Sequence, residues 1–245
     1  MAIKRLRVIA GPNGSGKSTL FSLLKNQVKV GAWVNADELL NHITIHKTLD
    51  YDIIGFKATQ KDFKTFRNRK TSVQFLEEFA IENEIDGIVF GRFTIAFSDA
   101  KFSNQSALFL SDFFRFYLLK KDISFTTETV FSHPSKLALL QQARKAGFKT
   151  YLYFIATEKA EINIGRISGR VFKGGHNVSS QKIRDRFPRS LAMLSEAIPF
   201  CDRVYVFDNT QFNAILVASF LNGKLNYIMP GKVVDWVNNI ITNHL

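Results

Sequence analysis

One stretch near the start of the chain constrains the fold more than any other feature. It reads GPNGSGKST and occupies residues 11–19. The pattern G-x-x-x-x-G-K-[ST] has four fixed places, filled here by Gly11, Gly16, Lys17 and Ser18. The segment KRLRVIA at 4–10 precedes the stretch and is predicted to be a short buried strand, and the helix-like LFSLLKNQ follows it. The sequence therefore predicts a strand, a glycine-rich loop and a helix in direct succession.

This pattern is typical of a loop that holds phosphate groups. Glycine lets the backbone approach an anion closely, successive N–H groups point inward, and the following helix adds the positive end of its dipole. We expect Lys17 to reach the β- and γ-phosphates of ATP, Ser18 to give an oxygen to Mg²⁺, and Thr19 to lie near the α-phosphate. The residues expected to contact the nucleotide are Gly11, Pro12, Asn13, Gly14, Ser15, Gly16, Lys17, Ser18 and Thr19.

Strand-like and helix-like segments alternate along the chain. This order predicts an α/β sandwich of the P-loop kinase type, with a mostly parallel central sheet and helices on both faces. We expect one domain over 1–245, with a helical and β insertion at about 48–104 and a C-terminal hairpin plus helix at about 212–245. The segment SSQKIRDRFPRSLAMLSEA is expected to be helical in two pieces around Pro188.

Two acidic motifs follow predicted strands. VNADEL at 34–39 places Asp37 beyond one strand, where a carboxylate can take a proton from an acceptor hydroxyl or hold Mg²⁺. The alternative is a helix cap by Asn35 or Asp37, and the residues alone do not decide between these roles. FTTETVFSH at 125–133 places Glu128 at another strand end, as a candidate for Mg²⁺ or for sugar hydroxyls, or as an ordinary strand-end acid.

Several cations in the second half of the chain could meet the charge of a transferred phosphoryl group. Arg166 and Arg170 are four positions apart and share a helix face. A second group follows the loop KGGHNV and consists of Arg184, Arg186 and Arg189. His176 in that loop either contacts a ligand or has no role. Asp208 and Asn209 follow a strand and either contact the nucleotide or form a turn.

Composition limits the class of protein. A single cysteine, Cys201, excludes an internal disulfide framework and favours a cytoplasmic protein, and no apolar run is long enough for a membrane span. The net charge of +12 suits a protein that binds phosphorylated ligands. The basic stretch 57–70 could contact nucleic acid, but we favour a solvated helix whose phenylalanines face a core.

The ordered set of motifs resembles the zeta-toxin family of P-loop kinases over most of residues 5–209. The resemblance is carried by GPNGSGKST, VNADEL, TTETVFSHPSK, GRVFKGGHNV, IRDRFPRSL and VFDN. It implies a kinase that transfers phosphate from ATP to the sugar 3′-hydroxyl of UDP-N-acetylglucosamine, and a small helical antitoxin as a protein partner.

The same resemblance assigns roles to individual residues. Lys17 becomes the phosphate-binding lysine and Asp37 the catalytic base, while Glu128 and Thr129 fall at the acceptor-sugar site. Arg166 or Arg170 matches the first γ-phosphate arginine, and the second lies in the GGHNV loop or at Arg186. The stretch between Asp37 and Glu128 is longer than in a minimal family member. The alternatives are therefore a P-loop kinase acting on a nucleic-acid end or a dinucleotide, and a nucleotide-dependent switch protein.

Overall fold

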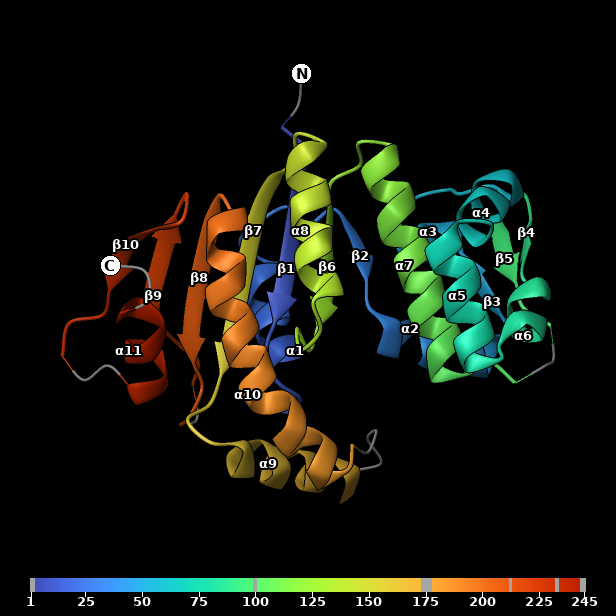
Figure 1. The fold of residues 1–245 in the computed structure, drawn as a ribbon. Helices are drawn as coiled ribbons and strands as arrows, with labels where there is room; N and C mark the ends of the chain where they lie inside the picture. The colour runs from blue at the N-terminus through green and yellow to red at the C-terminus, as the bar shows by residue number, and fades with distance from the viewer. Residues whose placement is uncertain (1–2, 99–100, 173–177, 212, 232–233, 243–245) are drawn as a thin grey trace. The chain divides into compact units, whose positions relative to one another are not determined.

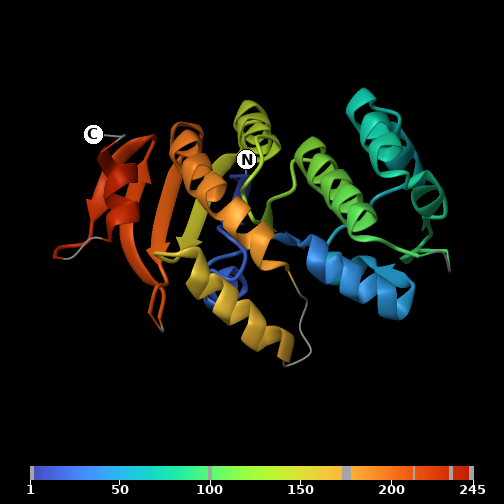
Figure 2. The same cartoon turned by 60° about the horizontal axis from the view of Figure 1, so that its bottom comes forward.

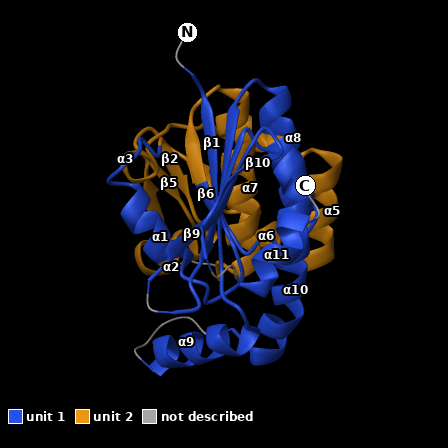
Figure 3. Ribbon diagram, turned by 90° about the vertical axis from the view of Figure 1, so that its left-hand side faces the viewer, with its two compact units in different colours: residues 1–30, 127–245 blue, residues 31–126 orange. Residues whose placement is uncertain are grey.

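The computed structural model describes residues 3–98, 101–172, 178–211, 213–231 and 234–242. The chain forms two compact units. Unit 1 comprises residues 1–30 and 127–245, and unit 2 comprises residues 31–126 (Figure 3). Each unit has its own helices and strands.

A mostly parallel sheet forms the centre of unit 1 (Figure 1). Its strands are β1 (Arg5–Ala10), β6 (Phe125–Thr129, whose first two residues belong to unit 2), β7 (Lys149–Ala156), β8 (Arg203–Asp208), β9 (Ile215–Leu221) and β10 (Lys224–Ile228). Their order across the sheet is β10-β9-β8-β7-β1-β6. β1, β7 and β8 pair in parallel, whereas β9 and β10 pair antiparallel. The phosphate-binding loop thus leaves the carboxyl end of a central strand.

Helices cover both faces of this sheet, as the alternation of elements predicts. The helices of unit 1 are α1 (Lys17–Leu24), α8 (Ser135–Lys145), α9 (Ala160–Phe172), α10 (Ser180–Ala197), the short 3₁₀ helix η1 (Ile198–Phe200) and α11 (Asp235–Thr242). α8, α10 and α11 lie on one side of the sheet and α1 on the other (Figure 3). α9 lies beyond the carboxyl ends of the strands, next to the first turns of α10 (Figures 1 and 2).

Buried apolar side chains on the strands hold these layers together, and β1 and most of β7 are buried on both faces. Leu6 and Val8 of β1, Leu152 and Phe154 of β7 and Val204 of β8 are all almost fully buried. Paired residues point to the same face, so these side chains form one continuous apolar layer. At the other end of the sheet, Asn222 and Gly223 turn β9 into β10 with positive φ angles of 51° and 83°. This confirms the hairpin that the Asn-Gly pair predicts.

The expectation of two helical pieces around Pro188 is wrong. α10 runs from Ser180 to Ala197 as one helix with the proline inside it. Proline removes one backbone donor, but buried side chains hold the helix to the rest of the unit on both sides of it, among them Ile183, Phe187 and Met193. Tertiary packing therefore outweighs the local cost of the proline.

Unit 2 is mainly helical, with a small antiparallel sheet of order β3-β5-β4. Its elements are β2 (Ala32–Val34), α2 (Ala36–His46), β3 (Thr48–Asp50), α3 (Tyr51–Ile54), α4 (Gln60–Arg67), α5 (Lys70–Phe79), α6 (Glu82–Asp86), β4 (Val89–Phe90), β5 (Thr94–Ala96) and α7 (Asn104–Lys120). Phe63 and Phe66 of α4 pack edge-on or tilted against Phe113 of α7. The basic stretch 57–70 therefore directs its phenylalanines into a core, as we expected.

No helix in the described ranges is long and apolar enough to cross a membrane.

Candidate active site

Two other parts of unit 1, β7 and α9, pack closely against the phosphate-binding loop. Gly11 has φ 145° and Gly14 has φ 78°, a region that residues with side chains rarely adopt. A Cβ atom on Gly11 would collide with the carbonyl oxygen of Ile155 at the end of β7. One on Gly14 would lie 2.7 Å from the carbonyl oxygen of Asn163 on α9. The loop is therefore shaped by β7 and α9 as well as by its own sequence.

Lys17 and Ser18 begin α1, and both reach the same carboxylate. Lys17 Nζ donates to the carbonyl oxygen of Pro12 at 3.0 Å and lies 4.0 Å from Glu128 Oε1. Ser18 Oγ donates to Glu128 Oε2 at 3.2 Å. The side chains of Lys17 and Glu128 are only 8% and 12% exposed. A cation, a hydroxyl and a carboxylate thus meet beside the loop, in a partly desolvated place where electrostatic interactions are strong.

The donor set fits Mg²⁺. A hydroxyl oxygen and one carboxylate are hard ligands, and Mg²⁺ at nucleotide sites commonly takes one or two carboxylates with the remaining positions filled by phosphate oxygens and water. Within the described ranges, no group of three or more His, Cys, Asp or Glu side chains could form a dedicated metal cage. Ser18 and Glu128 would therefore hold the ion together with a bound nucleotide.

The loop that follows β8 is hydrogen-bonded to the phosphate-binding loop. Asn209 Nδ2 donates to the carbonyl oxygen of Ser15 at 2.8 Å. Asp208 accepts from the Thr210 hydroxyl at 2.7 Å and from Trp236 Nε1 at 3.1 Å. Asp208 thus forms the turn that was one of the two alternatives, and Asn209 contacts the phosphate-binding loop.

Two polar atoms of the loop are buried without a hydrogen-bond partner among the described residues. They are Ser15 Oγ and Asn13 Oδ1. Leaving a buried polar group unsatisfied costs free energy, on the order of 1–3 kcal/mol. Such groups are therefore ready to interact with a ligand or water at the loop.

α9 packs on the phosphate-binding loop and carries Arg166 and Arg170. The Cγ1 atom of Ile167 lies 3.1 Å from the place of a Cβ on Gly14, so this part of α9 packs directly on the loop. Arg166 precedes Ile167, and its Nη2 donates to the carbonyl oxygen of Gln211 at 2.8 Å. Arg170, one turn further, is exposed. The structure thus ties Arg166 to the loop after β8, and Arg170 lies on the exposed part of the helix.

α10 carries the other arginines. Ser190, which is buried, donates to the carbonyl oxygen of Val130 at 2.8 Å, two residues after Glu128. Arg186 precedes Ser190 by four positions and so shares its face of the helix. Arg184 and Arg189 make other contacts, with the carboxylate of Glu161 at 3.4 Å and with the carbonyl oxygen of Asp185 at 2.8 Å. Of the three, Arg186 is therefore the one directed along the face that contacts the segment after β6.

The turn after β6 has an unusual backbone. Phe131 has φ 59° although its side chain is bulky and almost fully buried. Its N–H donates to Thr129 Oγ1 at 3.2 Å. The hydroxyl of Thr129 therefore stabilises this turn. Neither role could be predicted from the sequence, because a single serine or phenylalanine is not typical of any particular site.

Asp37 belongs to unit 2, and the structure identifies the residue that caps its helix. Asn35 Oδ1 accepts from the backbone N–H groups of Asp37 at 2.9 Å and Glu38 at 3.3 Å. Glu38 accepts from Trp33 Nε1 at 2.7 Å. The exposed Asp37 carboxylate, in contrast, makes neither a hydrogen bond nor an ion pair with any described residue. Asn35 is thus the cap, and the Asp37 side chain is available for another role.

Residues 173–177, which include His176 and most of the GGHNV loop, lie outside the described residues.

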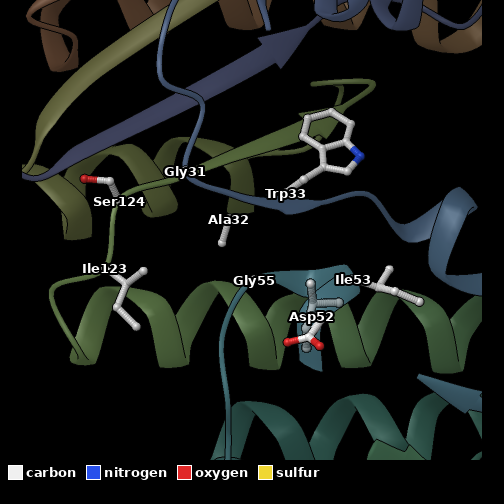
Figure 4. Close-up of a pocket in the computed structure, with 9 residues that line it drawn as sticks. Gly31, Ala32, Trp33, Asp52, Ile53, Gly55, Ile123 and Ser124 are labelled. Atoms are coloured by element: carbon white, nitrogen blue, oxygen red, sulfur yellow. The ribbon is translucent and has the colours of Figure 1, made fainter. Parts of the chain in front are cut away.

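Unit 2 also has an open cavity of about 560 Å³. Its lining is formed by Gly31, Ala32, Trp33, Asp52, Ile53, Ile54, Gly55, Ile123 and Ser124. Figure 4 shows Ala32 and Trp33 pointing to opposite sides of β2, as neighbours on a strand do. The cavity lies at the start of β2, and none of the site residues expected from the sequence lines it. We therefore assign it no part in the candidate site.

Solved structures with a similar fold are known. No protein-family model matches the chain. A stretch of 71 residues is 31% identical to an uncharacterised protein of Haemophilus influenzae, and it covers 29% of this chain and 51% of that protein. The whole chain is similar to a chain of the AvrRxo1-ORF1:AvrRxo1-ORF2 complex solved with sulphate ions, with a TM-score of 0.58 and 16% identity.

The same complex solved with ATP gives a TM-score of 0.51 and 14% identity over the whole of this chain. In both cases this chain spans 65% of the length of the solved chain. Similarity at this level shows a shared fold. The predicted α/β sandwich, with a mostly parallel central sheet and helices on both faces, is thus confirmed.

Proposed function

We propose that this protein is an ATP-dependent kinase of the zeta-toxin type, which transfers the γ-phosphate of ATP to a hydroxyl group of a small acceptor. UDP-N-acetylglucosamine or a related UDP-sugar is the acceptor of first choice. The observation that carries the proposal is the meeting of Lys17, Ser18 and Glu128 beside the glycine-rich loop. That arrangement supplies what binding a nucleoside triphosphate with Mg²⁺ requires.

The reaction is a single in-line displacement. The acceptor oxygen forms a bond to the γ-phosphorus, the bond from that phosphorus to the β,γ-bridging oxygen breaks, and ADP leaves. Lys17 stabilises the charge on the β- and γ-oxygens. When bound at Ser18 and Glu128, Mg²⁺ neutralises part of the same charge. Because little covalent chemistry falls to the protein, most of the rate acceleration comes from positioning and from such fixed charges.

Arginine side chains would balance the remaining negative charge of the γ-phosphate. Arg170 is exposed on the helix that packs against Gly14, and Arg186 is directed toward the segment after Glu128. We assign these two residues to the γ-phosphate, where guanidinium groups can bind two oxygens at once. Arg166 has a different task in this proposal. Its bond to Gln211 links α9 to the loop after β8, so it positions the nucleotide-binding elements.

Asp37 is the proposed base. It takes the proton of the acceptor hydroxyl as the phosphoryl bond forms. Two observations support this role: its carboxylate is exposed, and the capping task belongs to Asn35. Glu128 is assigned to Mg²⁺ because it accepts from Ser18, and Thr129 is assigned to the turn that shapes the acceptor site.

The AvrRxo1-ORF1:AvrRxo1-ORF2 structures are complexes of two proteins. Together with the zeta-toxin resemblance, they support a small antitoxin as a second partner of this chain. Co-expression with the product of a neighbouring gene and purification through a tag on one of the two proteins tests this part of the proposal.

A transfer assay tests the activity. The protein is incubated with Mg²⁺, ATP labelled at the γ-phosphate, and separate acceptors: UDP-sugars, nucleotides, dinucleotides and RNA ends. We expect label in a UDP-sugar, appearing about 10²–10³ times more slowly with Lys17→Ala. Label in an RNA end or a dinucleotide would keep the kinase and replace its acceptor. ATP binding without transfer to any acceptor, in protein that folds normally, would favour a nucleotide-dependent switch and overturn the proposal.

A further inference from the structure

One face of the unit-1 sheet combines tyrosines and cations. Residues paired across neighbouring strands point to the same face. One such row consists of Ile9, Tyr153, Tyr205, Ser219 and Tyr227. The adjacent row consists of Arg7, Tyr151, Arg203, Leu221 and Lys224. We call these ten residues the tyrosine face. It holds four of the six tyrosines of the chain and three cations, and neither row includes an acidic residue.

This face is the one with less helical cover. Among the helices that the structure describes in unit 1, α8, α10 and α11 pack on the opposite side and α1 packs on this one (Figure 3). α1 follows β1 in the chain and packs against it, so the β8–β10 part of the face is the more open one. Arg203 and Lys224 are exposed there, and Tyr227 is 40% exposed. A sheet face facing solvent is normally lined by scattered polar side chains rather than by large rings.

The contacts between these side chains fix the rings in place. The rings of Tyr153 and Tyr205 stack with their centroids 5.1 Å apart and their planes 17° apart. The guanidinium of Arg7 lies over the ring of Tyr151 at 5.3 Å. Arg7 is only 6% exposed, and its Nε and Nη1 atoms have no hydrogen-bond partner among the described residues. Arg7 is therefore a buried part of this face, whereas Arg203 and Lys224 are the cations that a ligand can reach.

The geometry points to a binding platform for single-stranded nucleic acid on the tyrosine face. Two features favour this occupant. The exposed cations Arg203 and Lys224 match a phosphate backbone. The rings of Tyr151, Tyr205 and Tyr227 are at least partly exposed and offer surfaces on which unpaired bases stack, while the buried Tyr153 holds Tyr205 by stacking on it. An acidic polypeptide would match the cations but would make little use of the three accessible rings. The inference does not depend on kinase activity, since binding to the face requires none of the residues assigned to phosphoryl transfer.

Fluorescence anisotropy with a labelled oligonucleotide of about 12 nucleotides tests the inference, because such a length covers one platform of this kind. RNA and DNA of the same sequence are titrated with the full-length protein without ATP at several salt concentrations. Tighter binding of RNA would identify contacts to the 2′-hydroxyl, and equal binding would identify stacking and backbone contacts alone. In both cases we expect the affinity to fall as salt rises.

Variants separate the two kinds of contact. Tyr227→Leu should raise the Kd at least about fivefold, the low end of the effect of losing one base–aromatic stack, while Tyr227→Phe should retain the wild-type affinity. Arg203→Gln should reduce the slope of log affinity against log salt by about 0.7, the value for one lost phosphate contact on a single strand. Lys61→Gln on α4 removes the same charge from unit 2 and serves as the control.

Three results would overturn the inference: no binding of either oligonucleotide at low salt, a loss with Lys61→Gln as large as with Arg203→Gln, or competition by polyglutamate as effective as that by unlabelled RNA. The last result would identify an acidic polypeptide as the occupant. Should Tyr227→Leu fail to fold, Arg203→Gln still decides, because within the described ranges this exposed side chain donates only to the Tyr205 hydroxyl, at 3.4 Å.

Discussion

The Ser18 hydroxyl donates a hydrogen bond of 3.2 Å to Oε2 of Glu128, which lies 110 positions further along the chain. Two motifs that are far apart in sequence are thus in direct contact in unit 1. Ser18 belongs to the phosphate-binding loop and the start of α1, whereas Glu128 lies near the end of β6. Since parallel strands end at one edge of the sheet, the fold brings such residues together. On this contact rests our proposal that Glu128 would hold Mg²⁺ together with Ser18.

Glu128→Gln should remove the effect of Mg²⁺ on nucleotide binding. In the wild-type protein, Mg²⁺ should increase the thermal stabilisation by ATP, and a ligand at ~100 times its Kd adds about 2.7 kcal/mol. The amide keeps the shape of the side chain but loses the charge that Mg²⁺ prefers. We expect the melting temperature with ATP and EDTA to be retained and the increment from Mg²⁺ to be lost. Glu196→Gln on α10, an exposed position, is the control. An unchanged Mg²⁺ increment would show that Glu128 is not a metal ligand.

Lys17→Ala should abolish most of the transferase activity while the fold survives. The Lys17 side chain is 8% exposed and its ammonium group donates to the carbonyl oxygen of Pro12, so it is positioned before the nucleotide binds. Loss of one such preorganised donor lowers rates by about 10²–10³. Initial rates of phosphate transfer at saturating ATP measure the effect, with the exposed Lys25→Ala as the charge-matched control. Wild-type turnover in soluble Lys17→Ala protein would refute the P-loop mechanism.

Asn209→Ala should weaken ATP binding more than it slows the chemical step. Its amide holds the carbonyl of Ser15 at 2.8 Å, so its loss loosens the phosphate-binding loop without removing a group that contacts the phosphates. A hydrogen bond of this kind contributes about 0.5–1.5 kcal/mol, which predicts a rise in Kd of roughly 2- to 13-fold. Isothermal titration with ATP measures it. Asn226→Ala removes a hydrogen bond from the side-chain amide of Asn226 to the Ser219 hydroxyl and should leave ATP affinity unchanged. A large loss of kcat at constant Kd would instead place Asn209 in the reaction itself.

The sequence predicts the parts of this protein whose signals are local. The glycine pattern with its flanking strand and helix, the Asn222-Gly223 hairpin and the phenylalanine-lined face of α4 each depend on neighbours within a few residues. Short-range spacing is enough to identify such features.

Roles that depend on long-range contacts could not be derived in this way. Asn209 supports Ser15 only because β8 ends near β1's loop in the folded sheet, and Pro188 lies inside a helix only because buried residues on both sides hold it. The tyrosine face is also invisible in the linear order, since its members come from five strands and align only through the register of the sheet.

The last prediction separates catalysis from helix capping at the start of α2. Asn35 Oδ1 accepts from two backbone N–H groups of the first turn, and Asn35 is only 7% exposed. Asn35→Ala should therefore lower the free energy of unfolding by about 1 kcal/mol. Asp37 is exposed and takes no part in the cap, so Asp37→Asn should leave the stability nearly unchanged.

For activity we expect the reverse: Asp37→Asn should lose activity and Asn35→Ala should retain it. An amide at position 37 cannot take a proton, and a positioned general base contributes about 10²–10⁴ to the rate. Asp37→Asn should reduce phosphate transfer by a factor in this range with ATP affinity almost constant, whereas Asn35→Ala should retain most of its turnover at a temperature well below its melting point. Urea unfolding and single-turnover transfer on the same preparations measure both quantities. If Asp37→Asn loses stability and keeps its rate, the base lies elsewhere; if it loses Mg²⁺-dependent ATP binding, Asp37 is a metal ligand.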